Sequence, residues 1–140
     1  MRYPVESTPD ARNGGFLVGF PDFPFVHSVG DTEEEALREA ADGLESGIEF
    51  FFDERRPAPM PSVPKRGQPT VTLPALMASK VLLHNEMLRQ GVKKAELARR
   101  MEMAPPNVER IFKLRYRTRI ETVEAALACL GKRLDVRLAR

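Results

Sequence analysis

Side chains that commonly do acid–base chemistry are scarce in this sequence. It holds two histidines, His27 in a predicted strand and His84 in a predicted helix, and neither sits in a catalytic motif. The patterns GxSxG and HExxH and a phosphate-cradling glycine loop are all missing. A structural or surface role suits each histidine better than general acid–base catalysis. The sequence therefore indicates a protein that is not an enzyme and needs no cofactor.

Acidic and sulfur ligands for a metal ion are also poorly represented. Asp22, Asp31 and Asp53 could form a carboxylate set for a divalent metal, as in a nuclease. Their positions fit structural roles better: Asp22 in a turn, Asp31 as a helix cap and Asp53 at a helix end. Glu33–Glu35 suit the positively polarised first turn of a helix. Cys129 is the single cysteine, which excludes an internal disulfide and a cysteine-rich zinc site. We expect no metal.

Charge divides the chain into two unlike halves. Residues 1–60 contain five Lys or Arg and 13 Asp or Glu, a net charge of −8, whereas residues 61–140 contain 17 and 7, a net charge of +10. Such opposed halves predict two modules with different partners. The basic module suits the phosphate backbone of a nucleic acid, and the acidic module suits a basic protein.

The basic half contains the spacing of a helix-turn-helix between residues 93 and 111. Leu97 and Ala98 face inward from a first helix, and Val108 and Ile111 face inward from a second one. A small residue at Ala98 lets the two helices cross closely. Because this pattern places a second helix on the surface, it predicts binding in the major groove of double-stranded DNA.

The outward residues of this unit are the candidates for contact with DNA. Pro106, Asn107, Arg110 and Lys113 are expected to meet base edges, since Asn pairs with adenine and Arg with guanine. Glu102 departs from the usual pattern, because it holds a turn position where glycine is common. A helical oligomerisation domain with a solvated basic face is the alternative. The residues expected to contact phosphates are Lys93, Lys94, Arg99, Arg115, Arg117 and Arg119.

The acidic half predicts a small antiparallel sheet covered by one helix over residues 1–56. Strands are expected near residues 3–7, 16–20 and 25–29, and Thr32 with Glu35 forms a capping box that begins the helix. Five prolines then mark residues 57–69 as a semi-rigid linker. Residues 70–73 alternate and are expected to return to the sheet as a strand.

Residues 70–140 are predicted to be helical after the first strand, with one more strand at the end. Helices are expected over residues 75–90, over 93–101, from Pro105, and from a second capping box of Thr118 and Glu121. Leu134, Val136 and Leu138 alternate with charged residues, and such an isolated strand is expected to pair with a second copy of the chain. The fold class is therefore α+β. Without a signal peptide or a membrane segment, we expect a soluble cytoplasmic protein.

Several short segments follow one another in a recognisable order and spacing. They are Met1–Val5, Gly14-Gly15, Pro21–Pro24, Gly30–Thr32, Glu35–Leu37, Pro59–Ser62, Ala78–Leu83, Glu96–Arg100 and Ala128–Lys132. Together they resemble the HicB family of antitoxins, in its longer branch with a C-terminal helix-turn-helix, and the resemblance covers nearly the whole chain.

The resemblance implies a partly RNase H-like first module that has no working active site and masks a HicA-type toxin, a small RNase that cleaves messenger RNA. It also implies repression of the protein's own operon. We expect toxin contact around Phe20, Asp22, Phe23 and Phe25. The alternatives are a self-contained transcription regulator whose first module senses a small ligand and, less favoured, an active nuclease.

Overall fold

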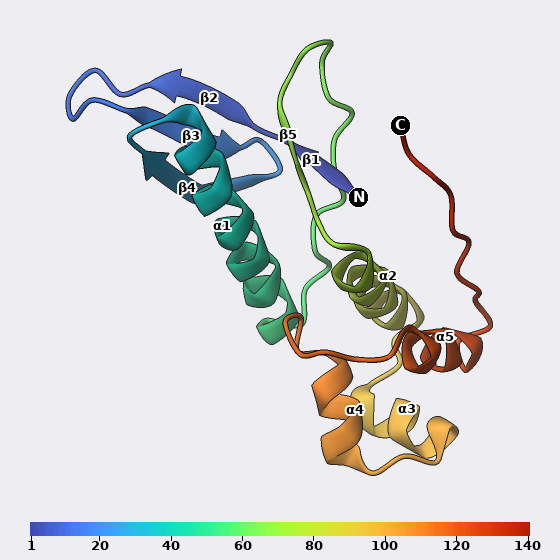
Figure 1. The fold of residues 1–140 in the computed structure, drawn as a ribbon. Coiled ribbons are helices and arrows are strands. Elements are labelled where there is room, and N and C mark those ends of the chain that lie inside the picture. The colour runs from blue at the N-terminus through green and yellow to red at the C-terminus, as the bar shows by residue number, and fades with distance from the viewer.

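The computed structural model describes residues 1–140 and confirms a mixed α+β fold, with small antiparallel sheets and one helix followed by several helices (Figure 1). The elements in chain order are β1 (Arg2–Pro4), β2 (Glu6–Pro9), β3 (Phe16–Phe20), β4 (Phe23–Gly30), α1 (Glu33–Asp53), β5 (Thr70–Thr72), α2 (Ala75–Gln90), α3 (Lys94–Met101), α4 (Pro105–Ile111) and α5 (Ile120–Ala128).

A three-stranded sheet in the order β2-β3-β4 is covered on one face by α1. The predicted capping box begins this helix: Thr32 Oγ1 accepts a hydrogen bond from the Glu35 amide at 3.1 Å. Gly43 and Gly47 let the helix approach β4 closely, since a Cβ atom at either position would lie about 3 Å from Val26. This contact fixes which residues of β4 are buried beneath α1.

The proline-rich segment between α1 and β5 has neither helix nor strand, yet it is held at several points. The Tyr3 hydroxyl donates to the Pro59 carbonyl at 2.8 Å, and the Asn85 side chain bonds both the amide and the carbonyl of Ala58. β5 is the strand predicted at residues 70–73, but it does not return to the three-stranded sheet as expected; it pairs with β1 in a separate two-stranded sheet. The fold of residues 1–56 therefore includes contacts with the proline-rich segment and with β5, which follow them in the sequence.

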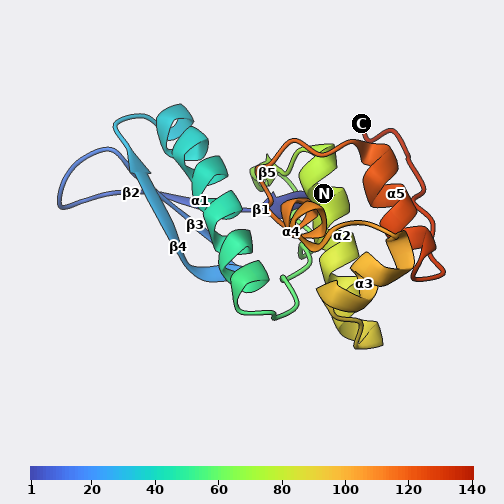
Figure 2. The ribbon, with the colours of Figure 1, turned by 90° about the horizontal axis from the view of Figure 1, so that it is seen from below.

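Helix α2 lies between the first module and the remaining helices (Figure 2). Its Val81 belongs to the same hydrophobic core as the sheet and α1, whereas Leu83 and Met87 belong to a second core formed with α3, α4 and α5. Leu114, from the segment between α4 and α5, also reaches the first core. Because α2 is buried on two sides, it joins the two modules into one body.

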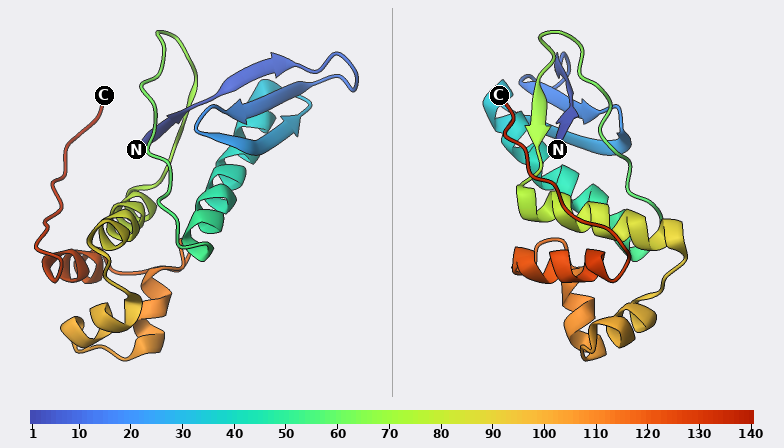
Figure 3. Two further views of the ribbon diagram at one scale, coloured as in Figure 1. Left: turned by 180° about the vertical axis from the view of Figure 1, so that it is seen from behind. Right: turned by 90° about the vertical axis from the view of Figure 1, so that its right-hand side faces the viewer.

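Two expectations for the C-terminal part need correction. Residues 132–140 form no strand in the single chain; they run as an extended segment away from α5 (Figure 3), with Val136 and Leu138 almost fully exposed. A strand here needs hydrogen bonds from a second chain, so its pairing stays a prediction. The second capping box was wrong: α5 begins after Arg119 without a side-chain cap, and the Thr118 hydroxyl instead donates to the Tyr116 carbonyl.

Candidate nucleic-acid and protein interfaces

Helices α3 and α4 form the compact pair that the sequence predicts. Leu97, Ala98, Val108 and Ile111 are buried together in the second core. Glu102 ends α3 in the left-handed conformation, with φ +53°, and the following amide of Met103 closes the turn on the Ala98 carbonyl at 3.0 Å. The turn therefore keeps the usual geometry although a glutamate replaces the common glycine.

The outward face of α4 presents polar and basic groups to solvent. Pro106, Asn107 and Arg110 are exposed, and an Arg110 guanidinium nitrogen donates to the Asn107 amide oxygen at 3.2 Å. Lys113 follows directly after the helix and is also exposed. Asn107 and Arg110 are thus exposed groups of the kind that can hydrogen-bond to base edges.

A shallow hollow beside α4 collects further basic residues from the segment before α5. Asn107 and Arg110 line it from α4, and Arg117 and Arg119 line it from the other side. None of these three arginines forms an ion pair with a carboxylate within the chain. Their charges remain available for an anionic partner such as a phosphate.

The opposite module has an exposed aromatic pair rather than the aromatic turn that we expected. Phe20 and Phe23 are buried in the first core and cannot contact a partner as they stand. Phe25 is 53% exposed and Phe50 is 43% exposed, and their ring centroids lie 5.6 Å apart. Asp22 is engaged by the amide and hydroxyl of Ser62.

An acidic groove extends from the same strand along the first half of α1. Residues 27–30 of β4 form one side, and the carboxylates of Asp31, Glu35, Glu39 and Asp42 line the remainder. β4 is also an edge strand of its sheet, with one side unpaired. An exposed aromatic pair, a free strand edge and an acidic groove together suit a basic protein.

Comparison with known proteins decides the family. A family model described as a HicB-like antitoxin of a bacterial toxin–antitoxin system matches residues 2–82. The chain belongs to the HicB-like antitoxin family. It is 43% identical to "Antitoxin HicB 2" of Photorhabdus laumondii over 97% of this chain and 95% of the relative. It is 38% identical to "Antitoxin HicB" of Escherichia coli over 97% and 98%, respectively.

In this HicB-like antitoxin, some of the predicted DNA contacts are occupied within the chain. The Lys94 ammonium lies 3.1 Å from the Glu109 carboxylate, and the Arg99 guanidinium pairs with the Glu96 carboxylate. Hydrogen bonds from Arg99 and Arg100 lower the pKa of Glu96 to about 2. These pairs are exposed and weak, so they can be exchanged for phosphates. Lys93 is exposed beside them and unpaired.

Arg115, also a predicted DNA contact, instead joins the two modules of the HicB-like chain. Its guanidinium lies 2.9 Å from the Asp42 carboxylate and 2.7 Å from that of Glu49, with Glu45 at 3.5 Å. All three carboxylates project from α1. Arg115 therefore holds the segment between α4 and α5 against the acidic module.

Sequence reasoning missed two functional candidates. Phe50 lies beside the inward stripe of α1, where nothing distinguishes it from a solvated helix position. Lys80 is fully buried in α2, and its ammonium donates to the carbonyls of Lys113 and Tyr116 at 2.7 Å each. Burial lowers the pKa of Lys80 to about 8. The one signal for Lys80 in the sequence was its position on the inward face of the helix predicted over residues 75–90.

Three further observations concern the whole chain. No helix has both the length and the apolar composition needed to cross a membrane. The structure gathers no three His, Cys, Asp or Glu side chains in a metal-binding arrangement. The family relatives are named as antitoxins rather than as enzymes.

Proposed function

We propose that this antitoxin masks a small basic HicA-type toxin with its first module and represses its own operon by binding operator DNA with its helix-turn-helix. The observation that carries the proposal is the separation of two unlike surfaces on one chain. One is acidic and aromatic, along β4 and α1, and the other holds the unpaired arginines beside α4. The family gives the antitoxin role, and the geometry supports this division of tasks.

Toxin contact is assigned to the exposed surface around Phe25, Phe50 and the acidic groove. Aromatic side chains at the centre of an interface supply most of its binding free energy, and complementary charge accelerates association. Asp22 lies beside this surface but is held by Ser62, so we place it at the rim. Phe20 and Phe23 support the surface from the core.

The toxin surface is tested with the variants Phe25→Ala and Phe50→Ala in the full chain. Each should weaken binding of the purified toxin by about 1–2 kcal/mol, roughly 5–30-fold, measured by calorimetry. Val63→Ala is the matched control, because Val63 is 90% exposed and lies on the proline-rich segment. Wild-type affinity in both phenylalanine variants, with intact growth rescue on co-expression, would contradict this assignment.

DNA contact is assigned to α4 and the basic segment that follows it. Asn107 and Arg110 are placed on base edges with Pro106 against them. Lys113 was expected at a base edge, but it lies beyond the end of α4, so we place it on phosphates together with Arg117 and Arg119. Lys93, Lys94 and Arg99 form a weaker outer set of phosphate contacts on α3 and the turn before it. Arg115 is left out of this set because the carboxylates of α1 hold it.

Operator binding is tested with one base-contact and one phosphate-contact variant. Arg110→Ala should cost about 1–3 kcal/mol and relax sequence preference at one base pair. Arg119→Gln should weaken binding to all sequences and reduce the slope of log K against log salt by roughly 0.9. Arg66→Gln, on the proline-rich segment, is the control for net charge. Equal losses in all three variants would indicate nonspecific attraction only.

The extended C-terminal segment is assigned to dimerisation. Leu134, Val136 and Leu138 alternate with charged residues, and the last two are almost fully exposed in the single chain. Pairing with the same segment of a second chain would satisfy their backbone groups. Two recognition helices would then meet half-sites about 34 Å apart. A monomer in light scattering at micromolar concentration would contradict the dimer.

A further inference from the structure

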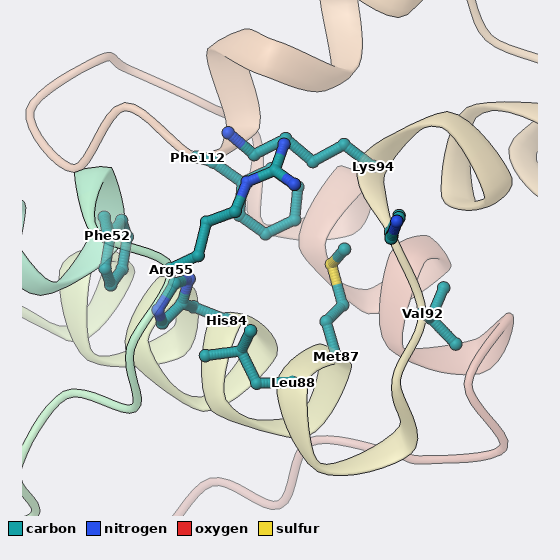
Figure 4. A pocket seen from close by; sticks show the side chains of 9 residues that line it. Phe52, Arg55, His84, Met87, Leu88, Val92, Lys94 and Phe112 are labelled. Carbon is teal, nitrogen blue, oxygen red and sulfur yellow. The ribbon is translucent and has the colours of Figure 1, made fainter.

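A small pocket lies where the end of α1, the middle of α2 and the start of the helix-turn-helix meet (Figure 4). Its volume is about 60 Å³, several times the ~10–15 Å³ that one water needs. The apolar part of the lining comes from Phe52, Met87, Leu88, Val92 and Phe112. These residues belong to four separate segments, so a ligand here would touch both modules at once.

The polar part of the lining is cationic. Arg55, Lys93 and Lys94 surround the pocket, and no carboxylate is among its lining residues. Only Lys94 has an ion pair, with Glu109 at 3.1 Å, and its ammonium lies 5.4 Å from the centre of the Phe112 ring. Figure 4 shows the Arg55 and Lys94 side chains converging on the same side of the pocket. Arg55 and Lys93 have no carboxylate partner within the chain, so both can pair with an anion at the rim.

The backbone of Arg55 adds to this argument. The residue follows the C-cap of α1 with φ +53°, where glycine is the usual choice. The left-handed conformation costs a residue with a Cβ atom about 1–2 kcal/mol. The Arg55 side chain extends across the pocket toward Phe112 (Figure 4).

His84 completes the wall but adds no charge. Its ring stacks on Phe52 with centroids 4.2 Å apart, and its Nε2 is hydrogen-bonded to the Arg56 carbonyl at 2.8 Å. Burial lowers the pKa of His84, which favours the neutral ring. The wall is therefore flat and apolar on this side.

We propose that this pocket binds a small organic monocarboxylate with an aromatic or branched apolar body. The apolar floor offers nothing to a fully hydrated inorganic anion, and the cationic rim offers no counter-charge to an amine. At about 60 Å³ the pocket holds a short branched chain or one edge of a single ring, and the carboxylate would lie outside it among the cations of the rim. Bound there, the carboxylate would bridge Arg55 of the acidic module and the lysines that begin the helix-turn-helix.

Benzoate is the first probe, titrated into the full-length protein by calorimetry without DNA or toxin, so the result is independent of the proposed function. We expect saturable binding of one benzoate per chain. Benzyl alcohol, which lacks the charge, and inorganic phosphate, which lacks the apolar body, should each bind at least about tenfold more weakly. Isovalerate, titrated in the same way, tests whether a carboxylate with a branched chain also binds.

Two variants place the binding in the pocket. Arg55→Gln removes a rim charge and Leu88→Phe fills the space, and each should lower benzoate affinity about tenfold or more. Arg66→Gln should leave the affinity unchanged, and thermal unfolding curves confirm that the variants are folded. The proposal is overturned if neither benzoate nor isovalerate binds saturably at millimolar concentration. It is equally overturned if a folded Leu88→Phe protein binds them as wild type does.

Discussion

Replacing Phe23 with alanine should lower the free energy of unfolding by about 3–5 kcal/mol, as expected for a buried phenylalanine. Its side chain has no exposed surface, and its ring lies edge-on to Tyr3 at 5.3 Å and to Phe51 at 5.9 Å between centroids. Gly47 of α1 also packs on the ring. Urea unfolding, followed by circular dichroism, measures the loss.

Phe25→Ala is the matched comparison for Phe23→Ala. The two residues are two positions apart on β4, but Phe25 is 53% exposed, so its loss should affect toxin affinity more than stability. A difference between the two variants is informative, because the sequence suggested both phenylalanines as toxin contacts. A stable Phe23→Ala protein that nevertheless fails to bind toxin would restore Phe23 to the interface.

The roles of these phenylalanines could not be predicted from the sequence because the strand pairing is irregular. In a regular strand, residues two apart face the same side, so Phe23 and Phe25 would be equivalent. The pairing of β3 with β4 shifts register between Gly19 and Phe20, and Phe23 and Val26 become the buried residues. Such a shift depends on the packing of α1 and leaves no periodic signal.

The helix-turn-helix was predictable because its signals are local. Helical periodicity places Leu97, Ala98, Val108 and Ile111 inward, and the structure buries all four. The position of Arg115 is different. It depends on how α1 approaches the segment before α5, and the residues that hold it are more than 65 positions away. From its charge alone, Arg115 was predicted to be one more phosphate contact.

The proline-rich segment illustrates the same limit. Its composition correctly excludes helix and strand, which local dihedral restrictions decide. Whether such a segment is free or attached depends on distant partners, here Tyr3, Asp22 and Asn85. The C-terminal strand depends on a partner that a single chain does not contain, so neither the sequence nor the fold of one chain tests it.

Lys80→Met should change how stability depends on pH. Burial lowers the pKa of Lys80 from 10.5 to about 8, so between these values the unfolded chain holds a proton that the folded chain has released. The stability contributed by this group therefore rises as the pH rises from 8 toward 10.5. The shift corresponds to a difference on the order of 3 kcal/mol. Relative to wild type, the methionine variant should thus become less stable as the pH is raised through this window.

The comparison must isolate Lys80 from other groups that titrate in alkali, and Lys65→Met, at an exposed position of the proline-rich segment, supplies the control. Urea unfolding at pH 7, 8, 9 and 10 should give a wild-type advantage over Lys80→Met that grows with pH, and none over Lys65→Met. The carbonyls of Lys113 and Tyr116 also lose their donor in the variant at every pH, which adds a constant destabilisation. Those carbonyls fix the basic segment beside α4, so operator affinity should fall with Lys80→Met at neutral pH even though Lys80 cannot reach DNA. A pH-independent difference in stability would show that the ammonium is hydrated in the folded protein, and unchanged operator affinity would show that α4 is positioned without it.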